Sequence, residues 1–446
     1  MKKVKLLISG ISIATALIVS GCAKESVDAP VAKTSDIVQT YAKIATTNYN
    51  DALNDAVKLQ TAVNTFTQNP TEETFQAAKD AWIHSRESYG QSEIFRLSNG
   101  PIDAEENWIS EAYGALEGQI NAWPLDENMI DYTIDADGKK TAGNIIDTAG
   151  AFNPGGEQST EVDVTTITKE ALTNLNENGG EANVSTGYHA IEFLLWGQDQ
   201  DYSNFIKDQV TSGDLVAGQR PLSDFTSDVN APRRLAYLKA VTDKLVEDLQ
   251  IVASAWDNKV DGTTGLYKAA LLNTLEGENA DKNIDEKTAM KQIFAGMGVF
   301  IKSELANERI AVAVLTPSEE DEHSCFSDNT HRDIATNYQG FKNVLLGIYE
   351  GKKLGKAPID ALNEEDKKRV TTLMTSIEAK IASVDEVART SRHFDRQIIS
   401  TDPQSKVIVK LKNEMRKLGD EMVNVAKANG IDLTVDDVTD AEETQI

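Results

Sequence analysis

The chain has 446 residues, of which 40% are hydrophobic and 26% are charged, so it is long enough and apolar enough to bury a sizeable core. Its formal net charge of −27 repels phosphate backbones and anionic lipid headgroups, which excludes nucleic acid as an expected partner. The same acidity suits cations, although most of these carboxylates are expected to serve solubility.

Residues 1–21 predict a removable signal peptide. Lysines occur within the first five residues, a largely apolar run follows, and small residues precede Cys22. Val19-Ser20-Gly21-Cys22 resembles the lipobox of bacterial lipoproteins, which implies cleavage before Cys22 and acylation of that cysteine. Two or more acyl chains anchor a protein stably. We therefore expect a lipid-anchored protein of the bacterial cell envelope, at the outer membrane and facing the periplasm or the cell surface.

Helical signals dominate the chain after a small, polar tether over residues 22–34. Apolar residues recur at steps of three and four, and alternating β patterns are hard to find. Asn69-Pro70-Thr71-Glu72 predicts a helix start with its cap before Pro70. Further helices are predicted over 36–66, 105–122, 285–314 and 364–383, with other starts near Pro232 and Pro403.

Long helices joined by irregular connectors predict an all-α protein made of two helical bundles. We expect an N-terminal bundle over 35–260, which carries the motif described next, and a C-terminal bundle over 261–431. The acidic tail over 432–446 contains no lysine and is predicted to be frayed.

The most informative pair is His189 and Glu192, which lie three residues apart and therefore on one face of a predicted helix. An imidazole and a carboxylate suit iron, zinc or another divalent metal. Such a pair taken alone is more often an ordinary hydrogen bond on a helix face.

A wider pattern surrounds this pair. Residues 183–199 closely resemble the Gly-x-His-x-x-Glu signature of the imelysin family, and companion segments resemble its subgroup called iron-regulated protein A. Those companions are Ala81-Trp82 with Arg86, Tyr89 to Arg96, Gly100 to Asp103, Asn121 to Asp126, Ile130 to Tyr132, and Glu320 to Asp333.

This resemblance implies two bundle-like helical halves and a surface lipoprotein associated with iron acquisition. It also implies a site: the motif falls on Gly187, His189 and Glu192, the best candidate for a third ligand is Glu93, and Arg86 and Asp103 would be supports. The expected ligand is a metal ion or metal complex, and the expected partners are the membrane, through the lipid anchor, and iron-uptake proteins of the envelope.

Two other function classes stay open. The family name implies a metallopeptidase with His189 as ligand and Glu192 as base, but the chain lacks the His-Glu-x-x-His and Gly-x-Ser-x-Gly patterns. Cys325 has no clear catalytic partner beyond the nearby histidines. The third hypothesis is a helical envelope adaptor without metal.

The segment 320–333 holds two histidines, a thiol and five carboxylates. We consider His323, Asp328 and His331 a possible second site, and a capped turn before the next helix is an equally good interpretation. His84 and His393 have no supporting ligands nearby in the sequence, so surface or packing roles are expected for both.

Overall fold

The computed structural model describes residues 35–105, 107–135, 137–201, 211–315, 317 and 322–440. The predicted signal peptide, Cys22 and the tether lie outside these residues. The described body falls within one compact unit, residues 32–446. The predicted division of that body near residue 260 stays a prediction.

The body is all-α, as predicted, and holds only two-residue strands. Its first part contains α1 (Asp36–Gln68), α2 (Glu72–Ser92), η1 (Glu93–Phe95), α3 (Trp108–Tyr113), α4 (Glu117–Ile120), α5 (Glu127–Ile130), β1 (Ala151–Phe152), β2 (Val162–Asp163), α6 (Lys169–Leu175), α7 (Gly187–Trp196), α8 (Ser223–Thr226) and α9 (Ala231–Ala255).

The later part is also helical and includes an unusual π-helical segment, η3. Its elements are α10 (Leu266–Leu271), η2 (Gly277–Lys282), α11 (Glu286–Val299), η3 (Phe300–Ala311), α12 (Val312–Leu315), α13 (Thr330–Leu346), β3 (Ile348–Tyr349), β4 (Lys352–Lys353), η5 (Pro358–Ala361), α14 (Glu364–Thr390), α15 (Phe394–Ile398), α16 (Ser405–Ala428) and η6 (Asp436–Val438).

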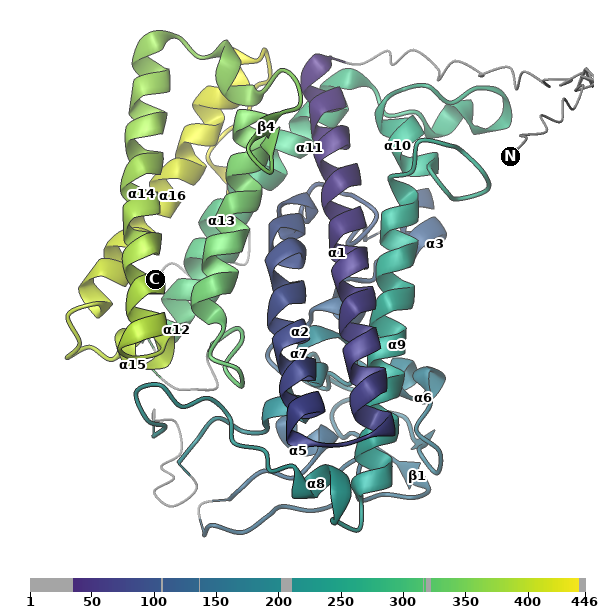
Figure 1. The fold of residues 1–446 in the computed structure, drawn as a ribbon. Helices are drawn as coiled ribbons and strands as arrows, with labels where there is room; N and C mark the ends of the chain where they lie inside the picture. The colour runs from purple at the N-terminus through teal and green to yellow at the C-terminus, as the bar shows by residue number, and fades with distance from the viewer. Residues whose placement is uncertain are drawn as a thin grey trace, which may run out of the picture. The chain divides into compact units, whose positions relative to one another are not determined.

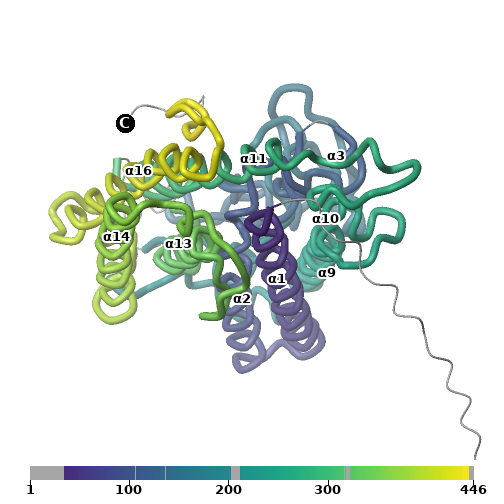
Figure 2. The backbone as a smooth tube through the Cα atoms, turned by 90° about the horizontal axis from the view of Figure 1, so that it is seen from above, coloured from purple at the N-terminus to yellow at the C-terminus, as the bar shows by residue number. Residues whose placement is uncertain are grey.

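Two groups of long helices form the core. In the first group α1 packs against α2 and α9, and the three run side by side in Figures 1 and 2. In the second group α16 packs against η3, α11 and α14. Short helix α7 packs against α9 and α2, and all of its residues are buried. Helix α7 therefore lies inside the first group.

Helix α13 joins the two groups because it packs against both α2 and α14. Two glycines allow this close approach. A Cβ atom on Gly340 would lie 2.2 Å from the backbone oxygen of Gln91, and one on Gly90 would lie 2.1 Å from Oγ1 of Thr336. The α2–α13 contact therefore depends on the absence of side chains at these positions.

Several helix ends differ from the predictions. Thr71, rather than a residue before Pro70, caps α2: its hydroxyl accepts from the backbone N–H of Thr74. The helix predicted over 105–122 is divided into α3 and α4 because Gly114 (φ +86°) ends α3 in a left-handed conformation. The tail is packed as far as Asp440, since Val438 is buried and η6 contacts α11.

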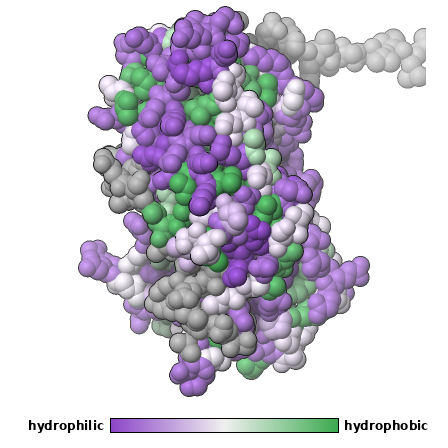
Figure 3. All heavy atoms as spheres, turned by 90° about the vertical axis from the view of Figure 1, so that its left-hand side faces the viewer, coloured by the Kyte–Doolittle hydropathy of each residue, from purple (hydrophilic) through white to green (hydrophobic). Residues whose placement is uncertain are grey.

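The surface agrees with the composition. On the side of the molecule where α14 lies in Figure 1, hydrophilic residues dominate and hydrophobic residues are scattered among them (Figure 3). None of the helices in the described ranges combines the length and the apolar character needed to cross a bilayer.

We predict that Gly340→Ala destabilises the protein by about 1–3 kcal/mol, because the new methyl group would overlap a backbone oxygen that cannot move without shifting α2. Urea unfolding followed by circular dichroism measures this loss. Gly180→Ala is the matched control, since its added Cβ would meet nothing closer than 3.9 Å. Equal stability of the two variants would contradict close packing of α2 on α13.

Candidate functional site

Helix α7 begins at a glycine that the surrounding backbone requires. Gly187 has φ +83°, and a Cβ atom there would lie 2.5 Å from the carbonyl oxygen of Ile120. The helix then places His189 and Glu192 one turn apart, and Nδ1 of His189 lies 2.9 Å from Oε2 of Glu192. Both side chains are fully buried. The predicted side-by-side arrangement in the interior is confirmed.

The other ring nitrogen of His189 faces a second histidine. Its Nε2 atom lies 3.2 Å from Nε2 of His323, which belongs to the loop 322–329 before α13. Nδ1 of His323 is in turn 2.8 Å from Oδ2 of Asp333 on α13. Each imidazole therefore has a carboxylate at Nδ1, and the two Nε2 atoms face each other.

Burial determines the protonation of this chain of groups. It lowers the pKa of His189 well below the ordinary value and also lowers the pKa of His323. Burial raises the pKa of Glu192 to about 8, although two hydrogen bonds from Ser327 oppose this rise. Burial also tends to raise the pKa of Asp333. The charge of Arg86 and the contact with His323 outweigh this effect and hold the pKa of Asp333 far below its usual range.

At pH 7 these pKa directions leave one consistent set of donors and acceptors. Protonated Glu192 donates to Nδ1 of His189, whose Nε2–H donates to Nε2 of His323. His323 then donates from Nδ1 to ionised Asp333, which also accepts from the hydroxyl of Ser324. Every polar atom along this row has a partner.

A buried network of ion pairs adjoins the histidines. Arg86 donates from Nε to Asp333 at 3.2 Å and from a terminal nitrogen to Asn121 at 2.6 Å. Its guanidinium also lies over the ring of Tyr188, 4.9 Å from the centroid. Arg86 therefore fixes Asp333, and its predicted role as a support of the site stays a prediction.

Glu93 lies within this network. Its carboxylate accepts from Arg309 and from Nδ2 of Asn337, the latter at 3.1 Å, and it is 3.8 Å from Arg86. His189 itself hydrogen-bonds with Glu192 and His323. Glu93 instead contacts arginines, which does not favour the predicted role as a third ligand beside His189.

The π-helical geometry of η3 brings a second carboxylate to the same arginine. In a π-helix the backbone hydrogen bonds join residues five apart, so Glu304 and Arg309 lie close enough along the helix for their side chains to meet. Arg309 donates to Oε1 of Glu304 at 2.5 Å, and Arg96 donates to the same oxygen at 2.9 Å. Arg96 is also 3.4 Å from Glu117.

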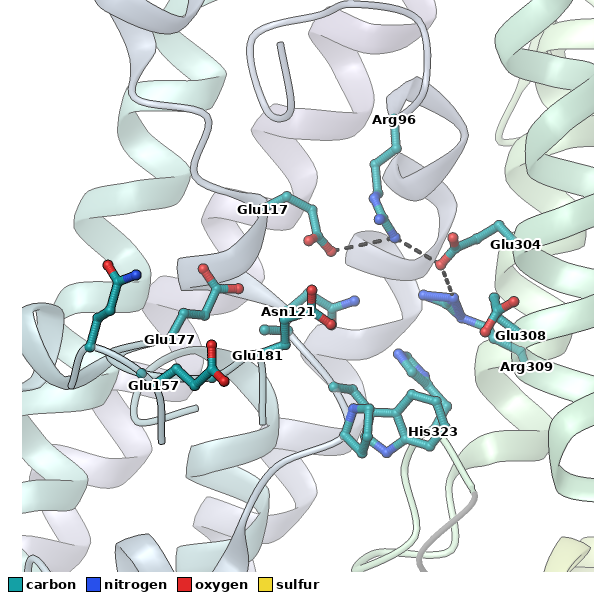
Figure 4. A pocket seen from close by; sticks show the side chains of 16 residues that line it. Arg96, Glu117, Asn121, Glu157, Glu177, Glu181, Glu304, Glu308, Arg309 and His323 are labelled. Carbon is teal, nitrogen blue, oxygen red and sulfur yellow. Dashed lines mark hydrogen bonds and ion pairs between the residues drawn. The ribbon is translucent and has the colours of Figure 1, made fainter. Parts of the chain in front are cut away.

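These groups line a cavity of about 800 Å³ that reaches His323. Figure 4 shows His323 below Arg309, with the arginine pairs at one end and further glutamates on the other side. The lining is strongly acidic: its glutamates are Glu117, Glu157, Glu177, Glu181, Glu304 and Glu308, against Arg96 and Arg309. Cations are favoured in such a pocket.

The remaining predicted residues do not gather at this site. Asp103 accepts from the backbone N–H of Leu97 at 2.6 Å and so supports the turn after η1. The structure also divides the possible second site: His323 joins His189, whereas the ring of His331 lies 3.7 Å from Asp385. The carboxylate of Asp328 contacts His393, so His393 has a partner that its sequence neighbours did not indicate.

Sequence reasoning missed the pairing of His189 with His323, which are 134 residues apart. No spacing rule relates them. In the sequence Asp333 is marked only as the end of a segment that resembles the family, because its acceptor role depends on where α13 packs. The one usable signal was that the segments around His189 and His323 both matched the same family pattern.

Comparisons with known proteins agree with this fold. Residues 45–422 match the peptidase family model described as Imelysin. The curated iron-regulated protein A of Synechococcus elongatus is 23% identical over 305 residues, which is 68% of this chain and 62% of that relative. This chain therefore spans less than two thirds of that relative's length.

A solved structure shares the fold. The crystal structure described as an iron-regulated protein A precursor from Parabacteroides distasonis matches with a TM-score of 0.56 and 16% identity. The match covers 87% of this chain and 93% of the other. At this identity the likeness concerns the fold alone.

We predict that Glu192→Gln removes a pH dependence of stability. The folded pKa of about 8 exceeds the ordinary value of 4.5, so the folded state binds more protons and loses stability as pH rises between these values. Unfolded histidines still titrate around pH 6.5 and contribute a slope of the opposite sign, but they do so equally in the wild type and in Glu192→Gln, so the difference between the two profiles isolates Glu192. Relative to this variant, the wild type should lose up to ~1.4 kcal/mol per pH unit from 6.5 to 8.

Urea unfolding at several pH values in this window measures the slope. The amide introduced by Glu192→Gln can donate to His189 and accept from Ser327 as the protonated acid does, so the variant should keep its fold and lack the part of the slope that comes from Glu192. Glu276→Gln, at an exposed position, should retain the wild-type slope. An unchanged slope in Glu192→Gln would show that Glu192 is already ionised at pH 6.5.

Proposed function

Because the chain belongs to the imelysin family, we propose that it is an iron-related binding protein that holds a metal ion between His189 and His323. The observation that carries this proposal is the pair of buried Nε2 atoms, 3.2 Å apart, each on an imidazole whose Nδ1 faces a carboxylate. The relative's name, iron-regulated protein A, supports iron as the metal.

The donor set fits a metal of this class. Imidazole nitrogens bind iron, zinc and copper, and metal-binding histidines usually donate from the other ring nitrogen to a carboxylate. Two nitrogens bound to one ion at roughly 2.0–2.1 Å and at the tetrahedral angle lie about 3.4 Å apart. The observed separation of 3.2 Å is close to that value. In this proposal Glu192 and Asp333 orient the two histidine ligands. Glu192 therefore supports His189 and does not itself bind the metal, although the sequence predicts it as a ligand.

The charges around the pair also favour a cation. Guanidinium groups and carboxylates that are buried or partly buried nearly balance near the histidines, with one more carboxylate than guanidinium while Glu192 is neutral. A divalent ion together with ionised Glu192 would complete the balance, which matters because uncompensated buried charge is costly. The groups counted are Arg86, Arg96 and Arg309 against Glu93, Glu117, Glu304 and Asp333.

The pocket gives a route to the pair. His323 lines the cavity, so a cation attracted by the glutamates can approach its imidazole. Two protein ligands would leave other coordination positions for water or for a chelating group carried with the metal. Such an open site suits reversible binding, whereas a closed four-ligand cage suits a structural ion.

The metallopeptidase alternative is less well supported. A general base must reach the metal-bound water, but Glu192 faces Nδ1 of His189 and accepts from Ser327, on the side of the ring opposite Nε2. Cys325 does not offer a nucleophile either, because burial raises the pKa of its thiol well above the ordinary value. An adaptor without metal remains the alternative if neither binding nor cleavage is found.

The envelope location is part of this proposal. The lipobox pattern at Cys22 supports a lipid anchor, at the outer membrane and facing the periplasm or the cell surface. Iron-uptake proteins of the envelope are the proposed partners. Palmitate labelling of the wild type and of Cys22→Ala, followed by membrane fractionation, tests this part separately.

We predict that metal-stripped protein reloaded with Fe²⁺ or Zn²⁺ binds about one ion per chain, and that His189→Ala and His323→Ala each weaken this binding at least tenfold. Elemental analysis after gel filtration measures the stoichiometry. His84→Ala is the matched control because its imidazole is 62% exposed and lies outside the site. Retained binding in both site variants would contradict the proposed ligands.

We also predict that binding releases about one proton per ion at pH 7. When Nε2 of His189 takes the ion it loses its proton, and Glu192 passes its own proton to Nδ1, so the site ends with one proton fewer. Calorimetric titration in two buffers of different ionisation enthalpy measures the release. Glu192→Gln cannot ionise, so its binding should release almost no proton. Equal release by both proteins would exclude this exchange.

A further inference from the structure

The loop that carries His323 also contributes to a second cluster of buried carboxylates. One oxygen from each of Asp199, Asp328 and Asp395 lies within 4.8 Å of the other two. The three residues are 3%, 2% and 1% exposed, respectively. Like charges at this spacing and depth repel one another strongly, because water does not screen them.

Three distant segments supply these residues. Asp199 follows the end of α7, Asp328 precedes α13 in a left-handed conformation (φ +57°), and Asp395 lies in α15. His393, directly before α15, contacts Asp328 through Nδ1, and its backbone N–H donates to the carbonyl of Asp214 at 2.7 Å. The cluster therefore lies where the end of α7, the His323 loop and α15 meet.

An unpaired atom points independently to a ligand. Within the described part of the chain, Oδ1 of Asp395 accepts no hydrogen bond, although it is fully buried. The other oxygen of the same carboxylate accepts from the hydroxyl of Ser212 at 3.0 Å. A buried carboxylate oxygen without a donor is costly unless a cation contacts it.

We propose that Asp199, Asp328 and Asp395 bind a calcium ion. Carboxylate oxygens are the hard ligands that Ca²⁺ prefers, and it binds them at roughly 2.3–2.6 Å, so oxygens on opposite sides of the ion are about 4.6–5.2 Å apart. Three oxygens no more than 4.8 Å from one another lie within this span. Mg²⁺ demands shorter distances and a stricter octahedron, so it suits the site less well.

Calcium at this position would fix the loop that serves the histidine pair. Within a few residues, this loop supplies His323 to His189, Ser327 to Glu192 and Asp328 to the cluster. The ion would tie the loop to α15 and to the end of α7. The expected role of the calcium ion is to hold His323 in position. This calcium site is separate from the iron site proposed above.

Calorimetric titration of chelator-treated protein with Ca²⁺ at 0.15 M NaCl tests the proposal, since the salt suppresses weak binding to exposed carboxylates. We expect one Ca²⁺ per chain in the wild type, and at least tenfold weaker binding in Asp395→Asn and in Asp199→Asn. Asp214→Asn removes the same charge from a neighbouring side chain that is 69% exposed, and should bind as the wild type does.

Hydrogen exchange gives a second readout. Ca²⁺ should slow exchange of the backbone amides of residues 322–329 in the wild type and in Asp214→Asn, and should have no such effect in Asp395→Asn. Wild-type affinity in Asp395→Asn, or the absence of stoichiometric Ca²⁺ binding by folded wild-type protein, would overturn the proposal.

The two metal sites can be told apart. His189→Ala should lose Fe²⁺ or Zn²⁺ binding but keep its Ca²⁺ site, because His189 is not part of the acidic cluster. Asp395→Asn should lose Ca²⁺ and retain its binding of Zn²⁺ at saturating concentration. Loss of both ions in one variant whose circular dichroism is unchanged would refute the separation of the sites.

Discussion

The contact between His189 and His323 is the interaction on which the surrounding structure depends. Both imidazoles are buried, so neither can rely on water for its hydrogen bonds, and each needs a protein partner at both ring nitrogens. Glu192 and Asp333 supply the outer partners, and the histidines supply each other. Asp333 in turn requires Arg86 to keep its charge in the interior. Arg86 therefore links the ion-pair network to that buried contact.

The contact also joins the two groups of helices. His189 lies on α7 in the first group, whereas His323 and Asp333 belong to the segment leading into α13, which packs against α2 and α14. Small residues where α13 crosses α2 allow the approach that brings these side chains together. The geometry of the histidine pair, and with it the binding of a ligand there, would therefore depend on how closely α13 packs against the first group.

Family membership accounts for the fold of this chain, whereas the reaction it can carry out depends on the chemistry of the site. The family match covers most of the chain, and the solved structure shares its fold at 16% identity. A fold hosts many activities, so neither the word peptidase in the family description nor the name of a relative decides the reaction. The position of Glu192 says more about a possible peptidase reaction. Its carboxyl group contacts Nδ1 of His189, so it orients the imidazole and does not face the Nε2 side, where a metal-bound water would lie.

The sequence alone determined the all-α class, the starts of most of the long helices and the pairing of His189 with Glu192, because these depend on local periodicity, caps and the three-residue spacing. Tertiary structure alone decided that His323 faces His189, that Glu93 pairs with Arg309 and that His393 contacts Asp328. The reason is physical: helix geometry relates residues a few positions apart, whereas these contacts join residues 65 to 216 positions apart and depend on how whole helices pack.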